Sequence, residues 1–147
     1  ILEGRTVGIL IADGTDANDL KTVKAAIKAA GGHPMTIAPK VGAVPLSDGS
    51  TVKADKQLFG QPSVTVDACA IILSEKATAK LLKEGAAVQW VMDAFGHLKA
   101  IGANEAAQPL LDKAGVEPDE GVTDLAGFVE AAKKRYWDRE PKVRTLA

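Results

Sequence analysis

The chain has 147 residues, of which 46% are hydrophobic and 25% are charged, and its formal net charge is −1. This size and apolar content predict one globular domain with a substantial core, and the near-neutral charge argues against a partner that is recognised by bulk charge, such as nucleic acid or an anionic membrane. The single cysteine excludes an internal disulfide framework, and the longest apolar runs have the length of strands rather than of membrane-spanning helices.

The first 38 residues predict a strand, a helix and a second strand. Residues 6–12 are a nearly continuous apolar run, which is typical of a strand buried on both faces. An acidic loop follows, and residues 17–30 then carry apolar side chains at helical spacing up to a stop of two glycines. The second strand is expected at residues 34–38.

Residues 40–67 have a different composition from the segments around them. Gly, Pro, Ser and Asp interrupt short β-like pieces there, and Asp48 and Gly49 form a favourable turn pair. We therefore expect a small β-hairpin insertion over this stretch.

The next part of the chain returns to alternating strands and helices. A third buried strand is expected at residues 68–74, followed by a helical region over residues 75–95 in which Gly85 marks a break. A fourth strand is expected at residues 98–102, and the helix after it should end near residue 114.

The C-terminal part completes the predicted architecture. Residues 116–123 are acidic and loop-like with room for one short edge strand, residues 124–137 predict a last amphipathic helix, and residues 138–147 an extended tail. Parallel strands joined by right-handed helical crossovers give an α/β fold, a three-layer α/β/α sandwich of flavodoxin-like or Rossmann-like type. We expect one domain over residues 1–137, and a start with neither Met nor a signal peptide predicts a fragment of a longer chain.

Ligands bind beyond the carboxyl ends of the strands in an open α/β sheet, where this chain places Asp13, Asp16 and Asp19 after the first strand. Three carboxylates repel a phosphate, so nucleotide and flavin sites are disfavoured. A Mg²⁺ site would use such acids, but a phospho-receiver domain also needs an Asp at the end of the third strand, where Ser74 stands. We expect Asp16 and Asp19 to cap the following helix instead.

Nucleophilic catalysis needs a Cys or Ser beside a base. Cys69 lies near the start of an apolar strand, which predicts a buried structural thiol, and no G-x-S-x-G motif occurs. His33 and His97 directly precede the second and fourth strands, which places both at the amino edge of the sheet. One Cys and two distant His also lack the spacing of a zinc site. The sequence therefore predicts neither hydrolase chemistry nor a bound metal.

The basic end of the chain is a weak candidate for nucleic-acid binding. Its positive charges, within residues 133–144, are interleaved with Asp138 and Glu140, while residues 117–124 are acidic. We favour an end that faces solvent or a partner. The basic and the acidic stretch would steer docking, with an effect that fades as the salt concentration rises.

Residues 99–111 have the pattern of a strand that turns sharply into a helix, and many α/β hydrolytic domains place a nucleophile at such an elbow. Here the turn holds Gly102, Ala103 and Asn104. The elbow is therefore expected without a nucleophile, and no catalytic residue is predicted.

Five segments carry a resemblance that extends over nearly the whole chain. They are Gly4-Arg-Thr-Val-Gly-Ile-Leu-Ile-Ala-Asp-Gly14, Val44-Pro-Leu-Ser-Asp-Gly49, Gly60-Gln-Pro-Ser63 leading into Val66-Asp-Ala68, Asp93-Ala-Phe-Gly-His-Leu-Lys-Ala-Ile-Gly102 and Arg135-Tyr-Trp-Asp-Arg-Glu-Pro141. Together they resemble the C-terminal domain of large-subunit haem catalases, and the segment that ends at Gly102 is the clearest match.

The resemblance implies a flavodoxin-like domain of the class I glutamine amidotransferase-like superfamily, which includes PfpI-type proteases and stress-protective chaperones. Active members carry a Cys at the elbow, often followed by His, and an acid on the first helix. Gly102 falls where the Cys belongs, Ala103 where the His would follow, and Asp19 near the acidic position. The resemblance thus implies a vestigial site.

The implied function is that of a non-catalytic domain in a catalase that converts hydrogen peroxide to water and oxygen. The domain would stabilise a homotetramer and shape the access of peroxide to a catalase core that precedes Ile1. Haem is expected in that core alone, because the single tyrosine here, Tyr136, lies in a charged helix end without a nearby histidine.

Two alternatives stay open at this point. A PfpI-like hydrolase, deglycase or glyoxalase is disfavoured because the elbow lacks Cys. A holdase chaperone for unfolded client proteins needs exposed apolar surface, for which Leu58, Phe59 and Trp90 are the candidates. The compartment is not predicted, beyond a soluble chain in the cytoplasm or secreted with its parent.

Overall fold

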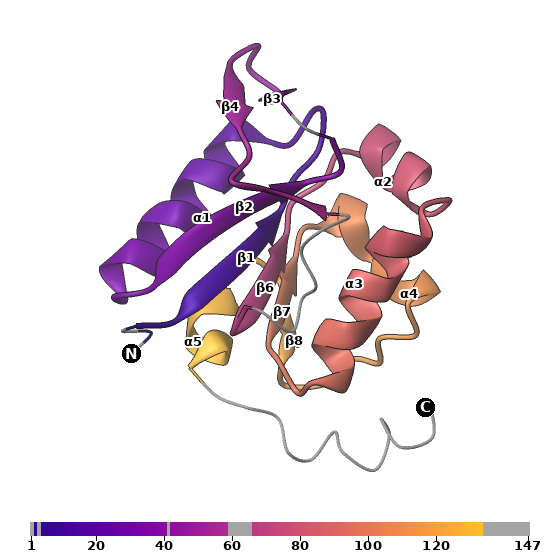
Figure 1. Ribbon diagram of the computed structural model, residues 1–147. Helices are drawn as coiled ribbons and strands as arrows, with labels where there is room; N and C mark the ends of the chain where they lie inside the picture. Colours follow the sequence, from indigo (N-terminus) through magenta and orange to yellow (C-terminus); the bar gives the residue numbers. More distant parts are fainter. Residues whose placement is uncertain (1, 3, 41, 59–65, 134–147) are drawn as a thin grey trace.

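The computed structural model describes residues 2, 4–40, 42–58 and 66–133, and in these the main sheet has six parallel strands in the order β5-β2-β1-β6-β7-β8 (Figure 1). The strands are β1 (Thr6–Leu10), β2 (His33–Ala38), β5 (Lys56–Gln57), β6 (Ala68–Ile71), β7 (Ile101–Ala103) and β8 (Val122–Thr123). The helical elements are α1 (Ala17–Ala29), α2 (Glu75–Leu81), α3 (Gly85–Gly96), the 3₁₀ turn η3 (Glu105–Ala107), α4 (Gln108–Lys113) and α5 (Phe128–Ala132). The expected α/β/α sandwich with a mostly parallel sheet is confirmed.

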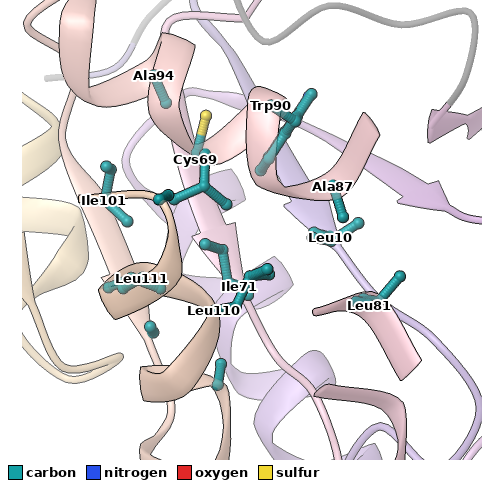
Figure 2. Close-up of a cluster of buried hydrophobic side chains, with 14 of the residues drawn as sticks. Leu10, Cys69, Ile71, Leu81, Ala87, Trp90, Ala94, Ile101, Leu110 and Leu111 are labelled. Atoms are coloured by element: carbon teal, nitrogen blue, oxygen red, sulfur yellow. The ribbon is translucent and has the colours of Figure 1, made fainter. Parts of the chain in front are cut away.

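Helices cover both faces of the sheet, which explains why β6 and the part of β1 after Thr6 contain only apolar residues and one glycine. On one face Val7 and Ile9 of β1 pack with α1 and α5, and Phe128 is fully buried there. On the other face Leu10 packs with α2, α3 and α4. Figure 2 shows this second layer, where Cys69 and Ile71 of β6 lie beneath side chains of α3 and α4. The core therefore lies in two layers, one on each side of the sheet.

Helix α1 begins and ends where its local sequence predicts. The side chain of Asp16 accepts a hydrogen bond from the backbone N–H of Asp19 at 2.9 Å, which satisfies one of the free donors of the first turn. At the other end Gly31 adopts φ +88°, and the N–H of Gly32 donates to the carbonyl of Ile27 at 2.9 Å. This left-handed glycine stop confirms the expected end of the helix.

The insertion contains the expected hairpin, formed by β3 (Ala43–Pro45) and β4 (Thr51–Lys53), but part of it also joins the main sheet. In the hairpin turn, Asp48 Oδ1 accepts from the N–H of Ser50 at 2.9 Å, and Gly49 has φ +86°. Beyond it, β5 pairs in parallel with β2. The expectation of a hairpin alone was therefore incomplete.

Hydrogen bonds between Thr36 and Asp55 place β5 beside β2 at the edge of the sheet. Asp55 Oδ2 accepts from the backbone N–H of Thr36 at 2.9 Å, and the hydroxyl of Thr36 accepts from the N–H of Asp55 at 3.0 Å. These bonds hold the returning chain beside β2.

The helix boundaries after β6 are partly as expected. The break expected at Gly85 occurs, because α2 ends at Leu81 and α3 begins at Gly85. The fourth strand was expected from residue 98 but begins at Ile101. Leu98 adopts φ +64°, and the N–H of Lys99 donates to the carbonyl of Ala94 at 3.1 Å, so a helix-ending turn takes up the residues before β7.

The last helix was expected from residue 124, but α5 begins at Phe128. Oδ1 of Asp124 accepts from the N–H of Gly127 at 2.8 Å, and this bond holds a turn in front of the helix. The expected edge strand within residues 116–123 is β8. The end of the predicted helix, the extended tail and most of the basic cluster lie outside the described residues, and Lys133 pairs with Glu130 at 3.0 Å.

Among the described residues, no helix has both the length and the apolar character that a bilayer crossing demands.

Candidate functional site

The parallel strands direct the segments that follow them to one edge of the sheet, where α/β proteins bind ligands. Four of these are the loops after β1, β2, β6 and β7. The predicted site residues come from two of these loops, namely the acidic loop after β1 and the elbow after β7. Their local contacts decide what chemistry this edge can perform.

The acidic loop after β1 is organised by hydrogen bonds to the backbone. Asp16 caps α1, as expected, and the N–H of Asp19 is its partner. The Asp19 side chain is half-buried, and this burial raises the pKa of its carboxyl, with a second contribution from the negative charge of Asp16. Asp13 is exposed, and its carbonyl accepts from the hydroxyl of Ser74 at 3.0 Å. In the described part of the chain no group of three or more His, Cys, Asp or Glu side chains is placed to hold a metal ion.

Thr15 is a fully buried polar residue in this loop, and sequence reasoning missed its role. Its hydroxyl donates to the carbonyl of Ile72 at 2.6 Å and accepts from the N–H of Ala12 at 3.0 Å. The threonine thereby connects the ends of β1 and β6. The sequence showed only a small hydroxyl residue between Gly14 and the Asp that caps α1. It did not indicate the hydrogen-bond partner, Ile72, which is 57 residues away.

The elbow after β7 turns later than its sequence suggested. Gly102 and Ala103 still belong to β7, and the sharp change of direction follows at Asn104, which precedes η3. A Cβ atom on Gly102 would lie 2.6 to 2.7 Å from three atoms of Phe128, well inside van der Waals contact. Gly102, the position to which the resemblance assigns the nucleophile, therefore has no room for a side chain while Phe128 keeps its place.

Asn104 has a structural role at the same elbow. Its Nδ2 donates to the carbonyl of Leu73 at 2.7 Å, and its Oδ1 accepts from the N–H of Leu73 at 3.0 Å. The backbone N–H of Asn104 donates to the carbonyl of Ile71 at 3.1 Å. The side chain thus extends the pairing of β6 and β7 past the end of both strands, and both of its polar atoms are occupied.

The remaining candidates for chemistry are far from this edge or inaccessible. Cys69 is fully buried in β6, as expected, and burial raises the pKa of its thiol from 9.0 to about 12 against the opposing effect of Lys99. His33 is the first residue of β2, at the amino edge. His97 was expected directly before the fourth strand. It instead caps the end of α3, four positions before β7 begins. The carboxyl edge thus receives neither a thiol nor an imidazole from these residues.

The apolar residues considered as exposed surface are core residues where the structure describes them. Leu58 is 6% exposed and Trp90 is 3% exposed, and both belong to the core layer covered by α3. Phe59 lies outside the described residues.

Comparison with known proteins gives a consistent family match. The family model of the C-terminal domain found in long catalases matches residues 3–139. The chain is 40% identical over 151 aligned residues to Catalase C of Rhizobium meliloti (strain 1021), covering 97% of this chain and 21% of that protein. It is 41% identical over 130 residues to Catalase-1 of Neurospora crassa, covering 88% of this chain and 18% of that protein. The chain thus spans about a fifth of the length of these relatives.

Two solved structures of similar fold belong to other groups of proteins. Drosophila melanogaster DJ-1beta superposes with a TM-score of 0.74 at 13% identity, covering 97% of this chain and 96% of that chain. A ThiJ/PfpI family protein from Pseudomonas syringae gives a TM-score of 0.74 at 12% identity, covering 99% of this chain and 75% of that one. At these identities the likeness concerns the fold alone.

Proposed function

The chain belongs to the family of C-terminal domains found in long catalases, and we propose that it serves such a catalase as a domain without catalysis of its own. The observation that carries this proposal is the packing of Gly102 against Phe128 at the elbow. A nucleophile at that position would need the space that the aromatic ring fills. The nearby polar atoms of Asn104 are already bonded to Leu73.

Cys69 offers no replacement for the missing nucleophile. A thiol with a pKa of about 12 is almost entirely protonated near neutral pH, and only the thiolate is a good nucleophile. The side chain is also completely shielded from solvent. We therefore interpret Gly102, Ala103 and Asp19 as the vestige of an active site that the resemblance implies.

An activity assay tests the absence of catalysis. The purified chain is incubated with peptide, ester and methylglyoxal substrates, beside a Cys69→Ala variant. We expect no turnover by either protein. A rate that disappears in Cys69→Ala would show that the active site is at the buried cysteine, and a rate that survives would place a PfpI-like activity elsewhere in the chain.

The parent's activity is part of the proposal, because the relatives are named catalases and the chain spans only about a fifth of their length. We propose that a haem-containing core converts hydrogen peroxide to water and oxygen. The cysteine and the two histidines do not suit haem ligation, since Cys69 is a buried protonated thiol and His33 and His97 lie exposed on separate elements. Haem is therefore assigned to the parent's core. Sequencing the encoding gene tests this, and a reading frame without a catalase core would contradict it.

The role proposed for the domain is to stabilise the homotetramer of the parent and to shape the access of peroxide to the core. Both roles would be tested on the haem-loaded full-length catalase and on a version that ends before Ile1. We expect the truncated enzyme to dissociate and to lose activity at lower temperature, as measured by sedimentation and by inactivation half-life. Its dependence on peroxide concentration should also change. Identical sedimentation, inactivation and kinetics would contradict the proposal.

A second candidate function is a holdase that protects unfolded client proteins. Leu58 and Trp90 do not support it, since both are buried, but the exposed apolar residues Ala43 and Pro45 of β3 do. The test is light scattering from a heat-aggregating client with the chain in several-fold molar excess. Suppressed scattering supports the activity, and unchanged scattering with the chain still folded counts against it.

A further inference from the structure

A cleft of about 550 Å³ opens at the carboxyl edge of the sheet, apart from the elbow residues. Its lining includes Asp13 from the loop after β1, Pro39 from the loop after β2 and Ser74 from the loop after β6. The chain passes from β1 to β2 on one side, and β6 lies on the other side of β1. Loops that leave neighbouring strands in opposite directions open a crevice between them, and this is where α/β proteins bind small molecules.

The walls of the cleft are held in place by hydrogen bonds to the loop after β1. One wall is strand β3 of the hairpin, and the N–H of Gly14 donates to the carbonyl of Pro45 at 2.8 Å. The other wall is α2, whose N-cap hydroxyl, Ser74 Oγ, donates to the carbonyl of Asp13 at 3.0 Å. Since both walls are attached to the same loop, the cleft exists before any ligand arrives.

The interior of the cleft is apolar. Its lining includes short or branched side chains from the strand ends, the hairpin and α2, namely Ala12, Ala38, Val44, Pro45, Ala77 and Leu81. Such a surface favours a hydrocarbon body, because removing apolar area from water on both partners is favourable.

Charged side chains from both sides complete the lining. Lys40 follows β2, while Lys76 and Lys80 are one turn apart on α2, and all three are exposed. Asp13 and Glu84 also line the cleft, so that three positive charges stand against two negative ones. In the described part of the chain none of these three lysines has a carboxylate within ion-pair distance.

Two backbone donors at the cleft and the hydroxyl of Ser74 are already in use, which narrows the class of ligand. The N–H of Gly14 is bonded to Pro45, and the N–H of Ala77 donates to Ser74 Oγ at 3.1 Å. A phosphate site would need several free N–H groups. The lysines act instead as flexible point charges on long stems, which suits a single carboxylate at the mouth of the cleft.

We propose that this cleft binds a small organic carboxylate, with its hydrocarbon body between β3 and α2 and its carboxylate facing Lys40, Lys76 and Lys80. The site is separate from the vestigial elbow and does not depend on a catalase core. Its test and the tests of the proposed function can therefore fail independently.

The probe is 2-naphthoate, titrated into the 147-residue chain and followed by naphthalene fluorescence and by backbone amide shifts. We expect saturable binding, with the largest shifts at the cleft lining, and affinity that falls as salt rises. Neutral 2-naphthalenemethanol should bind about five- to tenfold more weakly, since each exposed charge contact adds little. Equal or better binding of the neutral compound or of 2-naphthylmethylammonium would overturn the carboxylate assignment. The absence of binding at millimolar probe would overturn the site.

Variants separate the cleft from nonspecific binding. The double variant Lys76→Gln, Lys80→Gln should weaken 2-naphthoate binding about threefold or more and leave the neutral compound unchanged. The matched control Lys21→Gln, Lys28→Gln removes two exposed lysines of α1 that do not line the cleft, and it should bind as the unaltered chain does. Ala43→Phe, at an exposed position of β3, should reduce binding of both probes by filling the cleft. Equal weakening by the two lysine pairs, or amide shifts centred elsewhere, would overturn the proposal.

Discussion

A Cβ atom on Gly102 would lie 2.6 Å from Cδ1 and 2.7 Å from Cβ of Phe128. These contacts join the strand that leads to the elbow with the helix that covers it, and Phe128 is fully buried. In active relatives of this fold, the resemblance places a cysteine at the position of Gly102. The absence of a side chain at Gly102 and the close packing of an aromatic ring are therefore two aspects of one local arrangement.

The first prediction is that Gly102→Cys does not restore an active site and instead destabilises the chain. Overpacking of a well-filled core costs about 1–3 kcal/mol, because neighbouring side chains or backbone must shift. Urea unfolding measures the change. Ala103→Cys is the matched control, since it adds a thiol to the next strand residue, which already has a Cβ, and it should cost less.

A double-mutant cycle connects this cost to Phe128. Phe128→Ala alone should be strongly destabilising, by about 3–5 kcal/mol, because it empties a large buried volume. Combined with Gly102→Cys, the total loss should be smaller than the sum, because removing the ring relieves two of the three close contacts and leaves only the one with Cβ of residue 128. Additive losses, or a Gly102→Cys variant as stable as the unaltered chain, would contradict the packing argument.

The second prediction concerns Asn104. Asn104→Ala removes both side-chain bonds to Leu73 and leaves a buried N–H and carbonyl without these partners. We expect a loss of about 2–6 kcal/mol in the free energy of unfolding, at roughly 1–3 kcal/mol for each unsatisfied group. Gln108→Ala is the control, because Gln108 bonds Asp112 on the exposed surface and should cost under about 0.5 kcal/mol.

The conservative variant Asn104→Asp sharpens this test. It keeps the acceptor for the N–H of Leu73 but exchanges the donor for an oxygen that faces the Leu73 carbonyl. Its stability should be low near neutral pH and should improve as acid protonates the new carboxyl. An Asn104→Ala variant no less stable than Gln108→Ala would show that the two bonds contribute nothing.

The third prediction tests the connection that Thr15 makes between β1 and β6. Thr15→Val keeps the shape of the side chain and removes the hydroxyl, so that the Ile72 carbonyl and the Ala12 N–H lose their partner. A loss of about 1–3 kcal/mol is expected, with most of it recovered in Thr15→Ser. Thr22→Val, at an exposed position of α1, is the matched control. Equal effects at positions 15 and 22 would contradict the role assigned to the buried hydroxyl.

The predictable parts of the fold depend on residues that are neighbours in sequence. The cap by Asp16 and the glycine stop after α1 involve partners three to five positions apart, and the break before Gly85 also follows from the local pattern. The parallel sheet with helices on both faces follows from rules on crossover connections, given the alternation of strands and helices.

The parts that escaped prediction depend on pairs that are distant in sequence. Asn104 and Leu73 are 31 positions apart, and Thr15 and Ile72 are 57 apart. The contact between Gly102 and Phe128 likewise could not be inferred, because a glycine in a strand has several explanations until its neighbour is known. The absence of a Cys or Ser from residues 102–104 can be read from the sequence, but the reason that no side chain fits at Gly102 is tertiary.

The last prediction follows from the burial of Cys69. Burial raises the pKa of this thiol from 9.0 to about 12, so below pH 9 the thiol is neutral in both the folded and the unfolded chain. Between pH 9 and pH 12 the unfolded chain releases the proton and the folded chain does not. The free energy of unfolding must therefore fall in this window, by roughly 1 kcal/mol per pH unit well above the lower pKa.

Urea unfolding under reducing conditions, at pH 8 and at pH 10, measures this effect against Cys69→Ala. The variant should be less stable at pH 8, because it leaves a small cavity, but its disadvantage should shrink by about 1 kcal/mol at pH 10. Every other side chain is common to both proteins, so its contribution cancels in the comparison. A thiol reagent at pH 8 should modify Cys69 of the folded chain no faster than the chain unfolds enough to expose it. Rapid modification of the folded chain, or a difference in stability that does not change with pH, would mean that Cys69 is more accessible to water than its place in β6 implies.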